Sequence, residues 1–328
     1  MHRLVVFGSA RIDAFMELPE ELADQYCKLN TQDCYVQLSY ASKLPLNDVH
    51  FLVGGNGANV AVGSKRLGVD STLVAELGSG PLASYAKREL ENQVNMNFVT
   101  QTEGVGQGFG AVIVYQGERT ILSYYAPERP PFPKNLEAAE WAYLTSVGEQ
   151  FEAFYEDVYE WFATHKSKLA FNPGGRQIKK GKDWLDRYLK LTDLLLVNRE
   201  EAGEIVGMSK TKGKEKELLD ALNELGPRTP VVTDGREGSF AKDDGKYLRV
   251  GILPIDSIER TGAGDSYSTG CLSALIKGKK LKEALVWGTI NAGSVIGYIG
   301  PEDGLLREDQ LPEWLERAKS SELKVEEF

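Results

Sequence analysis

The sequence has few cysteines and no long apolar run. Its three cysteines, Cys27, Cys34 and Cys271, are too scattered for a disulfide framework, and no second pair completes a zinc site. They are predicted to be reduced thiols. No apolar run approaches the ~20 residues that cross a bilayer, and a charged residue comes too early in MHRLVVFGSARID for a signal peptide. We therefore expect a soluble, cytoplasmic protein with no membrane partner.

Basic residues are outnumbered as well. The 38 lysines and arginines face 48 acidic residues, which gives a formal net charge of -10 and a pI near 5.1. This balance argues against a general nucleic-acid binder. It does not exclude a nucleotide ligand, because the N–H groups at a helix N-terminus can bind phosphate whatever the net charge.

Strand and helix patterns alternate along most of the chain, which indicates a mostly parallel sheet covered on both faces. The rhythm lapses in an irregular polar stretch after residue 17 and in a hairpin pattern at 110–125. We predict one large α/β domain (1–14, 52–107 and 126–328) with a small β lid (15–51 and 108–125). The predicted strands are 4–7, 71–77, 142–147, 169–172, 194–198 and 230–233, with a second hairpin at 239–250; the predicted helices are 59–67, 82–93, 151–165, 182–191 and 217–225.

The most informative segment is ERTGAGDSY, at residues 259–267. Small residues before a helix leave its first N–H groups accessible, so a phosphate group can bind the backbone at the positive end of the helix dipole. Asp265 then lies beside that anion and can accept the proton of an attacking hydroxyl. The alternative is structural: Thr261 caps the helix and Asp265 complements the helix dipole.

A second segment, GGNGAN, precedes another predicted helix. Gly54 and Gly55 allow the backbone to approach a ligand closely. The amides of Asn56 and Asn59 carry donors and acceptors that suit a polyhydroxylated substrate. A glycine-rich turn with an asparagine cap is the alternative. The chain thus carries one site suited to hydroxyl groups and one suited to phosphate.

Together, GGNGANVAVGSKRLG and RTGAGDSYSTG resemble the two signatures of the ribokinase, or PfkB, family of carbohydrate kinases. The resemblance covers nearly the whole chain in order and spacing. It implies a ribokinase-like three-layer α/β fold with a β lid and Mg²⁺-ATP as phosphoryl donor. It also implies a sugar or sugar-like acceptor, as for ribokinase, fructokinase or 2-keto-3-deoxygluconate kinase, with Asp265 as base and the N–H groups of Gly262, Ala263 and Gly264 as anion hole.

The resemblance extends to further residues. Asp13 in FGSARID matches the family's substrate-binding aspartate, and Asn198 and Glu201 in VNREEAG match a motif linked to magnesium and phosphate. Mg²⁺ keeps several waters and few protein ligands, so Glu201 could hold its water shell. A helix N-terminal carboxylate is the alternative role for Glu201. The implied nucleotide contacts are Thr233, Gly235 and Gly238 in VVTDGREG, and Asn291.

Two departures from the family pattern affect what can be carried over. Where this chain has Glu259, many relatives have an aspartate that often helps to bind a monovalent cation. Dependence on such a cation is therefore left open. Residues 78–80, Gly-Ser-Gly, replace a frequent Gly-x-Asp and leave the substrate-side contacts open.

Other functions remain as alternatives. A nucleoside kinase of the same family needs an apolar slot for the base, for which the lid aromatics Tyr35, Tyr40, Phe109, Tyr124 and Tyr125 are available. An oxidoreductase is disfavoured, because GQGFG is followed by a β pattern and not by a helix. A noncatalytic sugar sensor is disfavoured by Asp265. Pairing of two lids in a homodimer is left open.

Overall fold

The computed structural model describes residues 3–22, 24–27, 34–116, 118–125 and 131–328. Its main sheet has the strand order β16-β15-β14-β13-β12-β11-β10-β1-β6-β7. The pairs from β7 to β13 are parallel, and those from β13 to β16 are antiparallel. The strands are β1 (Leu4–Phe7), β6 (Ser71–Leu77), β7 (Asn95–Gln101), β10 (Trp141–Leu144), β11 (Lys168–Phe171), β12 (Thr192–Asn198), β13 (Thr229–Thr233), β14 (Ser239–Asp243), β15 (Lys246–Val250) and β16 (Val325–Glu327).

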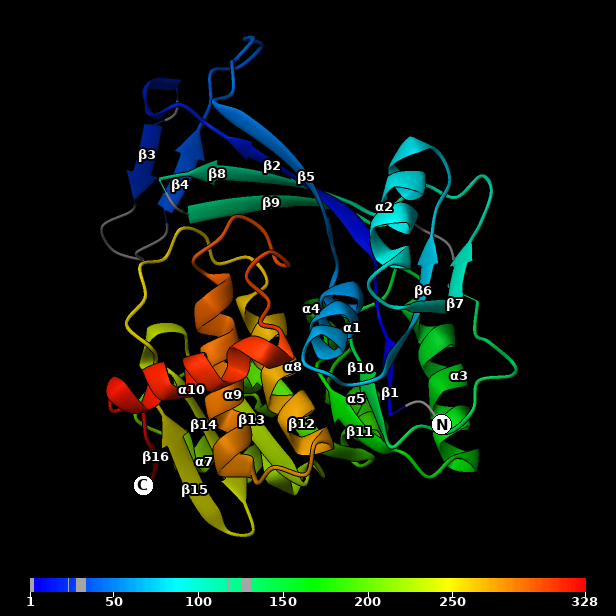
Figure 1. The fold of residues 1–328 in the computed structure, drawn as a ribbon, viewed down its shortest axis with the longest axis vertical. Coiled ribbons are helices and arrows are strands. Elements are labelled where there is room, and N and C mark those ends of the chain that lie inside the picture. Colours follow the sequence, from blue (N-terminus) through cyan, green and yellow to red (C-terminus); the bar gives the residue numbers. More distant parts are fainter. Residues whose placement is uncertain (1–2, 23, 28–33, 117, 126–130) are drawn as a thin grey trace.

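Helices cover both faces of the main sheet (Figure 1). One face carries α1 (Asn56–Arg66), α2 (Pro81–Glu91), α8 (Ala263–Ile276), α9 (Leu281–Val295) and α10 (Leu311–Ser320). The other face carries α3 (Phe151–Thr164), α4 (Gly175–Lys179), α5 (Lys182–Leu189), α6 (Arg199–Val206) and α7 (Glu215–Glu224). Short 3₁₀ helices are η1 (Glu20–Leu22), η2 (Gly235–Glu237) and η3 (Glu308–Gln310).

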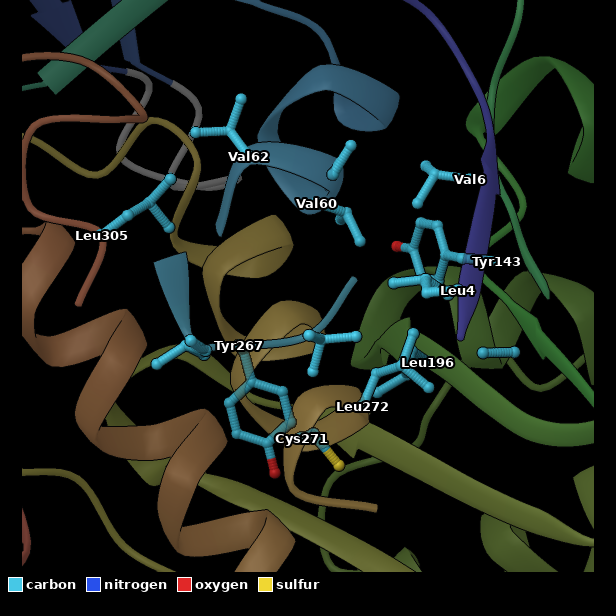
Figure 2. Close-up of a cluster of buried hydrophobic side chains, with 14 of the residues drawn as sticks. Leu4, Val6, Val60, Val62, Tyr143, Leu196, Tyr267, Cys271, Leu272 and Leu305 are labelled. Carbon is cyan, nitrogen blue, oxygen red and sulfur yellow. The ribbon is translucent and has the colours of Figure 1, made fainter. Parts of the chain in front are cut away.

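The two-residue period of β1 explains the three layers. Leu4 and Val6 point into the core under α1 and α8, whereas Val5 and Phe7 point into the core under α3. Figure 2 shows the first of these cores, where Leu4 and Val6 lie near Tyr143 of β10. The predicted α/β fold with a mostly parallel sheet is confirmed.

A separate four-stranded sheet has the order β5-β2-β8-β9 and lies across one end of the main domain (Figure 1). We call it the lid. Its parallel β2–β8 pairing joins the two segments from which the sequence predicts a single β layer. The strands extend beyond the predicted 15–51 boundary at both ends. They are β2 (Arg11–Glu17), β5 (Asp48–Gly54), β8 (Phe109–Tyr115) and β9 (Glu118–Tyr124).

The predicted reduced state of Cys34 is wrong. Two further strands, β3 (Asp24–Cys27) and β4 (Cys34–Gln37), form a two-stranded sheet within the stretch predicted to be irregular. Cys34 lies opposite Cys27 in this antiparallel register and is disulfide-bonded, whereas Cys271 is free and buried. Whether a cysteine finds a partner depends on which segments pair in space, which cysteine counting cannot reveal.

The sequence analysis did not predict β7, β16 or α10. The two strands are ordered by pairing with distant partners, β7 with β6 and β16 with β15. No helix in the described part of the chain combines the length and apolar character that a membrane crossing requires.

Candidate active site

The turn before α8 is shaped by a close approach of the backbone. Gly262 is the N-cap and has φ 78°, which a glycine adopts without strain. A Cβ at this position would lie 2.5 Å from the Cβ of Pro301, so no larger residue fits. The loop around Pro301 therefore fixes where α8 begins.

The start of α8 presents bare N–H groups at an open surface. The first helical bond runs from the N–H of Ser266 to the carbonyl of Gly262, so the N–H groups of Gly264 and Asp265 precede the helical ladder. Gly264 is exposed, and a Cβ there would meet no atom within 4 Å. The N–H of Ala263 donates to the carbonyl of Arg260, so this member of the predicted anion hole already has a partner inside the protein. The exposed start of α8 leaves space for a phosphate group, and the anion hole itself stays a prediction.

Asp265 and Asn59, 206 positions apart in the sequence, meet at this turn. The side-chain amide of Asn59 donates from Nδ2 to Oδ2 of Asp265 over 2.7 Å. Asn59 lies in the first turn of α1 and is buried, and its Oδ1 has no hydrogen-bond partner among the described residues. The two signature segments therefore form one site.

The carboxyl group of Asp265 is hard to ionise. Asp265 keeps part of its surface open, yet the surrounding protein desolvates it and raises its pKa from 3.8 to about 6. The hydrogen bond from Asn59 and the charge of Arg11 act in the opposite direction, and the charge of Asp13 adds to the increase. A base with this pKa is mostly ionised at neutral pH and still binds a proton readily.

Asp13 lies on β2 of the lid, between two glycines that make room for it. A Cβ on Gly54 would lie 2.5 Å from its Oδ2, and a Cβ on Gly110 would lie 2.1 Å from its Oδ1. Arg11 lies two residues earlier on the same face, with Nε 2.8 Å from Oδ1 of Asp13. Burial raises the pKa of Asp13, Arg11 opposes that increase, and Glu259 adds to it.

Sequence reasoning did not identify Arg11, although the two-residue spacing from Asp13 was a usable signal. The other predicted residues of GGNGAN surround this region. Gly55 is the N-cap of α1 and has φ 99°. A Cβ at this position would lie 2.6 Å from the carbonyl oxygen of Ser9. Asn56 is the first residue of α1 and is partly exposed.

Asn198 and Glu201 form a capping box at the start of α6. The N–H of Glu201 donates to Oδ1 of Asn198 over 2.8 Å, and the N–H of Asn198 donates to Oε2 of Glu201 over 2.9 Å. Burial raises the pKa of Glu201, and the charge of Asp265 raises it further. The helix-capping role of Glu201 is therefore real, and the carboxylate also lies within electrostatic range of Asp265.

Tyr143 of β10 lies within electrostatic range of both Asp265 and Glu201. Burial raises the pKa of its hydroxyl, and the charges of Asp265 and Glu201 raise it further. It thus lies in the field of both carboxylates, a position that no sequence pattern indicated.

The predicted nucleotide residues lie at neighbouring strand ends. Thr233 ends β13 and is paired in register with Asn198 at the end of β12. Gly235 begins η2, and Gly238 precedes β14. Carboxyl ends of parallel strands are where open α/β sheets bind ligands.

Asn291 is the exception among these residues. It is buried, its Nδ2 donates to the carbonyl of Ser266, and its Oδ1 accepts from the N–H of Leu306. Both ends of its amide are thus used inside the protein, and a nucleotide contact by Asn291 stays a prediction.

A pocket opens beside Arg11 between the lid and the main sheet. Its lining includes the backbone after β1, the glycines around 106–108, and the lid aromatics Tyr124 and Tyr125. The guanidinium of Arg176 lies 3.9 Å from the centre of the Tyr125 ring. No group of three or more His, Cys, Asp or Glu that could hold a metal occurs in the described ranges.

Solved structures share this fold over nearly the whole chain. A nucleoside kinase from Methanocaldococcus jannaschii, titled an archaeal member of the ribokinase family, gives a TM-score of 0.75 at 22% identity and covers 96% of this chain and 98% of its own. Arabidopsis thaliana ribokinase, complexed with ribose and ATP, gives 0.77 at 19% identity and covers 96% and 99%. These likenesses establish a ribokinase fold.

The family follows from the sequence comparison. The model of the pfkB family of carbohydrate kinases matches residues 23–307. An uncharacterized sugar kinase of Escherichia coli, YegV, is 26% identical over 313 residues, which are 94% of this chain and 92% of that protein. The chain belongs to the pfkB family of carbohydrate kinases, and it is a phosphotransferase.

Proposed function

We propose that this protein transfers the γ-phosphoryl group of ATP to a hydroxyl of a sugar or sugar-like molecule, with Asp265 as general base. The observation that carries the proposal is the contact of Asn59 with Asp265 beside the open start of α8. It joins a group that suits hydroxyls, a carboxylate with a pKa of about 6, and bare N–H groups that suit phosphate.

On the acceptor side, a buried polar atom awaits a hydroxyl partner. Oδ1 of Asn59 has no hydrogen-bond partner in the part of the chain that the structure describes, and Oδ1 of Asp13 has the ion pair with Nε of Arg11 at 2.8 Å. A hydroxyl group of an acceptor would give the Asn59 oxygen the partner that a buried polar atom requires. Asp265 then takes the proton of the hydroxyl that attacks.

On the donor side, the N–H groups of Gly262, Ala263 and Gly264 stabilise the charge of the transferring phosphoryl. Thr233, Gly235 and Gly238 line the ATP site in this proposal. Glu201 fits a place beside Mg²⁺, because it is acidic, largely desolvated and within range of Asp265. When bound there, Mg²⁺ would neutralise part of the negative charge of the phosphate groups.

The experiment is a coupled ADP-release screen against ribose, fructose, 2-keto-3-deoxygluconate and nucleosides, with Asp265→Asn as the paired variant. Acceptor-dependent ADP release by the native chain and its loss in the variant are the expected results. Release that is equal with and without every acceptor would refute the proposal.

A nucleoside acceptor is the second candidate. The favouring observation is the pocket that has both Tyr125 and Arg11, the ion-pair partner of Asp13, in its wall. An aromatic wall suits a nucleobase, since rings stack with favourable energy. Tyr125→Ala would then raise the KM of a nucleoside and leave that of ribose unchanged.

Lid pairing in a homodimer stays a prediction, and so does lid closure. Register places Asp13 and Ser123 on one face of the lid, because each is linked to Gly110. The opposite face carries the exposed apolar side chains Val49, Phe51, Leu122 and Tyr124. A second lid could cover that face and leave the active site open.

A further inference from the structure

Two ion pairs join the lid to the turn before α8, and the lid supplies the cation in one pair and the anion in the other. Nε of Arg119 lies 3.6 Å from Oε1 of Glu259, and Nη1 of Arg260 lies 3.4 Å from Oε1 of Glu118. Consecutive residues of β9 thus face consecutive residues of the turn with exchanged charges. The lid is therefore attached to the same segment that carries the anion hole.

The two pairs differ in burial. The side chains of Glu259 and Arg119 are 2% and 28% exposed, whereas those of Glu118 and Arg260 are 70% and 37% exposed. Exposed pairs contribute little, because water screens them and long side chains lose entropy. A buried carboxylate without its cation is costly. We therefore expect the pair of Arg119 with Glu259 to contribute more to the stability of the turn than the exposed pair.

Glu259 holds the turn in shape. Its Oε1 accepts from the backbone N–H of Thr261 over 2.7 Å and from the Thr261 hydroxyl over 2.5 Å. The N–H groups of Ile258 and Glu259 both donate to the carbonyl of Ile296 after α9. With Gly262 packed on Pro301, the turn is held from the main domain, and Arg119 is its contact from the lid.

The guanidinium of Arg119 and the carboxylate of Glu259 form an ion pair but no hydrogen bond. Oε2 of Glu259 is buried and has no hydrogen-bond partner in the ranges that the structure describes, and Arg119 lies beyond hydrogen-bonding distance of Oε1. A small movement of β9 toward the turn would bring guanidinium N–H groups onto both oxygens.

The lid that holds Asp13 also carries Arg119. Successive hydrogen-bonded pairs link β2 to β8 and β8 to β9, and Val114 is in register with both Glu17 of β2 and Arg119. Asp13 and Glu17 lie on one face of β2, since their positions differ by an even number. Arg119 therefore shares the face of Asp13, and the two move as parts of one sheet.

We propose that Arg119 is a positioning residue that acts through Glu259: when an acceptor draws the lid down, Arg119 fixes the turn that forms the anion hole. The inference rests on the proposed function, because it assigns the turn to phosphoryl transfer. It makes acceptor binding a condition for a competent anion hole and so limits transfer of the phosphoryl group to water.

The test uses Arg119→Met, which removes the charge and keeps most of the apolar length, with Arg119→Lys as the conservative variant. Glu118→Gln, which breaks only the exposed pair, is the matched control. We expect Arg119→Met to lower kcat on the order of 10²-fold, the scale for a misplaced reacting group, with the KM for ATP within about twofold. Arg119→Lys should retain most of the native kcat, and Glu118→Gln should have the kcat of the native chain.

A second readout needs no acceptor. Amide hydrogen exchange at residues 261–264 of the protein alone should be faster in Arg119→Met, relative to exchange in α3 of the same chain, and unchanged in Glu118→Gln. The melting temperature should fall in Arg119→Met and stay native in Glu118→Gln, because only the first change leaves a buried carboxylate unpaired. Unchanged exchange and kcat in Arg119→Met would overturn the inference, and so would a rise confined to the acceptor KM, which would mean a direct substrate contact. If the native chain phosphorylates no acceptor, the proposed function fails, while the exchange result still decides whether Arg119 orders the turn.

Discussion

Replacing Asp265 by Asn should make the protein more stable and much less active. The variant keeps the size of the side chain and an oxygen that can accept from Asn59. It removes the ionised form that the site disfavours. Turnover should fall by about 10²–10⁴, the usual contribution of a general base, while ATP still binds.

The stability change follows from the pKa. Burial raises the pKa of Asp265 from 3.8 to about 6, which corresponds to about 3 kcal/mol against the ionised folded state. Because the folded chain holds this proton more tightly than the unfolded chain, the contribution of Asp265 to stability is fully present below pH 3.8. It is lost as the pH rises through about 6. The amide of the variant has no such dependence.

The assay compares melting temperatures of the native chain and the variant at pH 7.5 and at pH 4. The variant should melt at a higher temperature at pH 7.5, and this difference should nearly vanish at pH 4. Asp309→Asn, at an exposed position of η3, is the control for the loss of one carboxyl group. An equal difference at both pH values would refute the electrostatic reasoning, and near-normal turnover would remove Asp265 from the mechanism.

Three further predictions concern the remaining parts of the site. Asn59→Ala should raise the acceptor KM more than the ATP KM. It should also move the acid limb of the kcat/KM profile to higher pH, because the hydrogen bond from Asn59 lowers the pKa of Asp265. A selective loss of ATP affinity in initial-rate kinetics would contradict the assignment of Asn59 to the acceptor side. Glu201→Gln should raise the Mg²⁺ concentration for half-maximal activity, and an unchanged magnesium titration would leave Glu201 as a helix cap only; the exposed neighbour Glu200, changed to Gln, is the control. Leu122→Glu should convert a dimer to a monomer with activity retained, as measured by light scattering, and a monomeric native chain would contradict lid pairing.

The local sequence carried most of the information on the main domain. The run from Leu4 to Phe7 is buried on both sides, and Ser71 to Leu77 forms the strand that was predicted. These elements were predictable because their apolar pattern is continuous or periodic within a few residues. β7 escaped prediction because its strand residues are mixed in polarity and are ordered by pairing with β6.

The site residues divide in the same way. Glycines, asparagines and the aspartate in GGNGAN and RTGAGDSY could be assigned a chemical role because helix N-termini expose N–H groups whatever surrounds them. Arg119 and Tyr143 carry no such local signal. Their importance arises from the charges that they face.

By itself the sequence determined the α/β alternation, the two signature segments and the type of chemistry that their side chains allow, because these depend on short-range periodicity and on residue type. Only the tertiary structure decided that Asn59 meets Asp265, that Gly54 and Gly110 enclose Asp13, and that Arg119 of the lid faces Glu259. Burial and charge pairing set these relations, and both depend on which distant segments pack together.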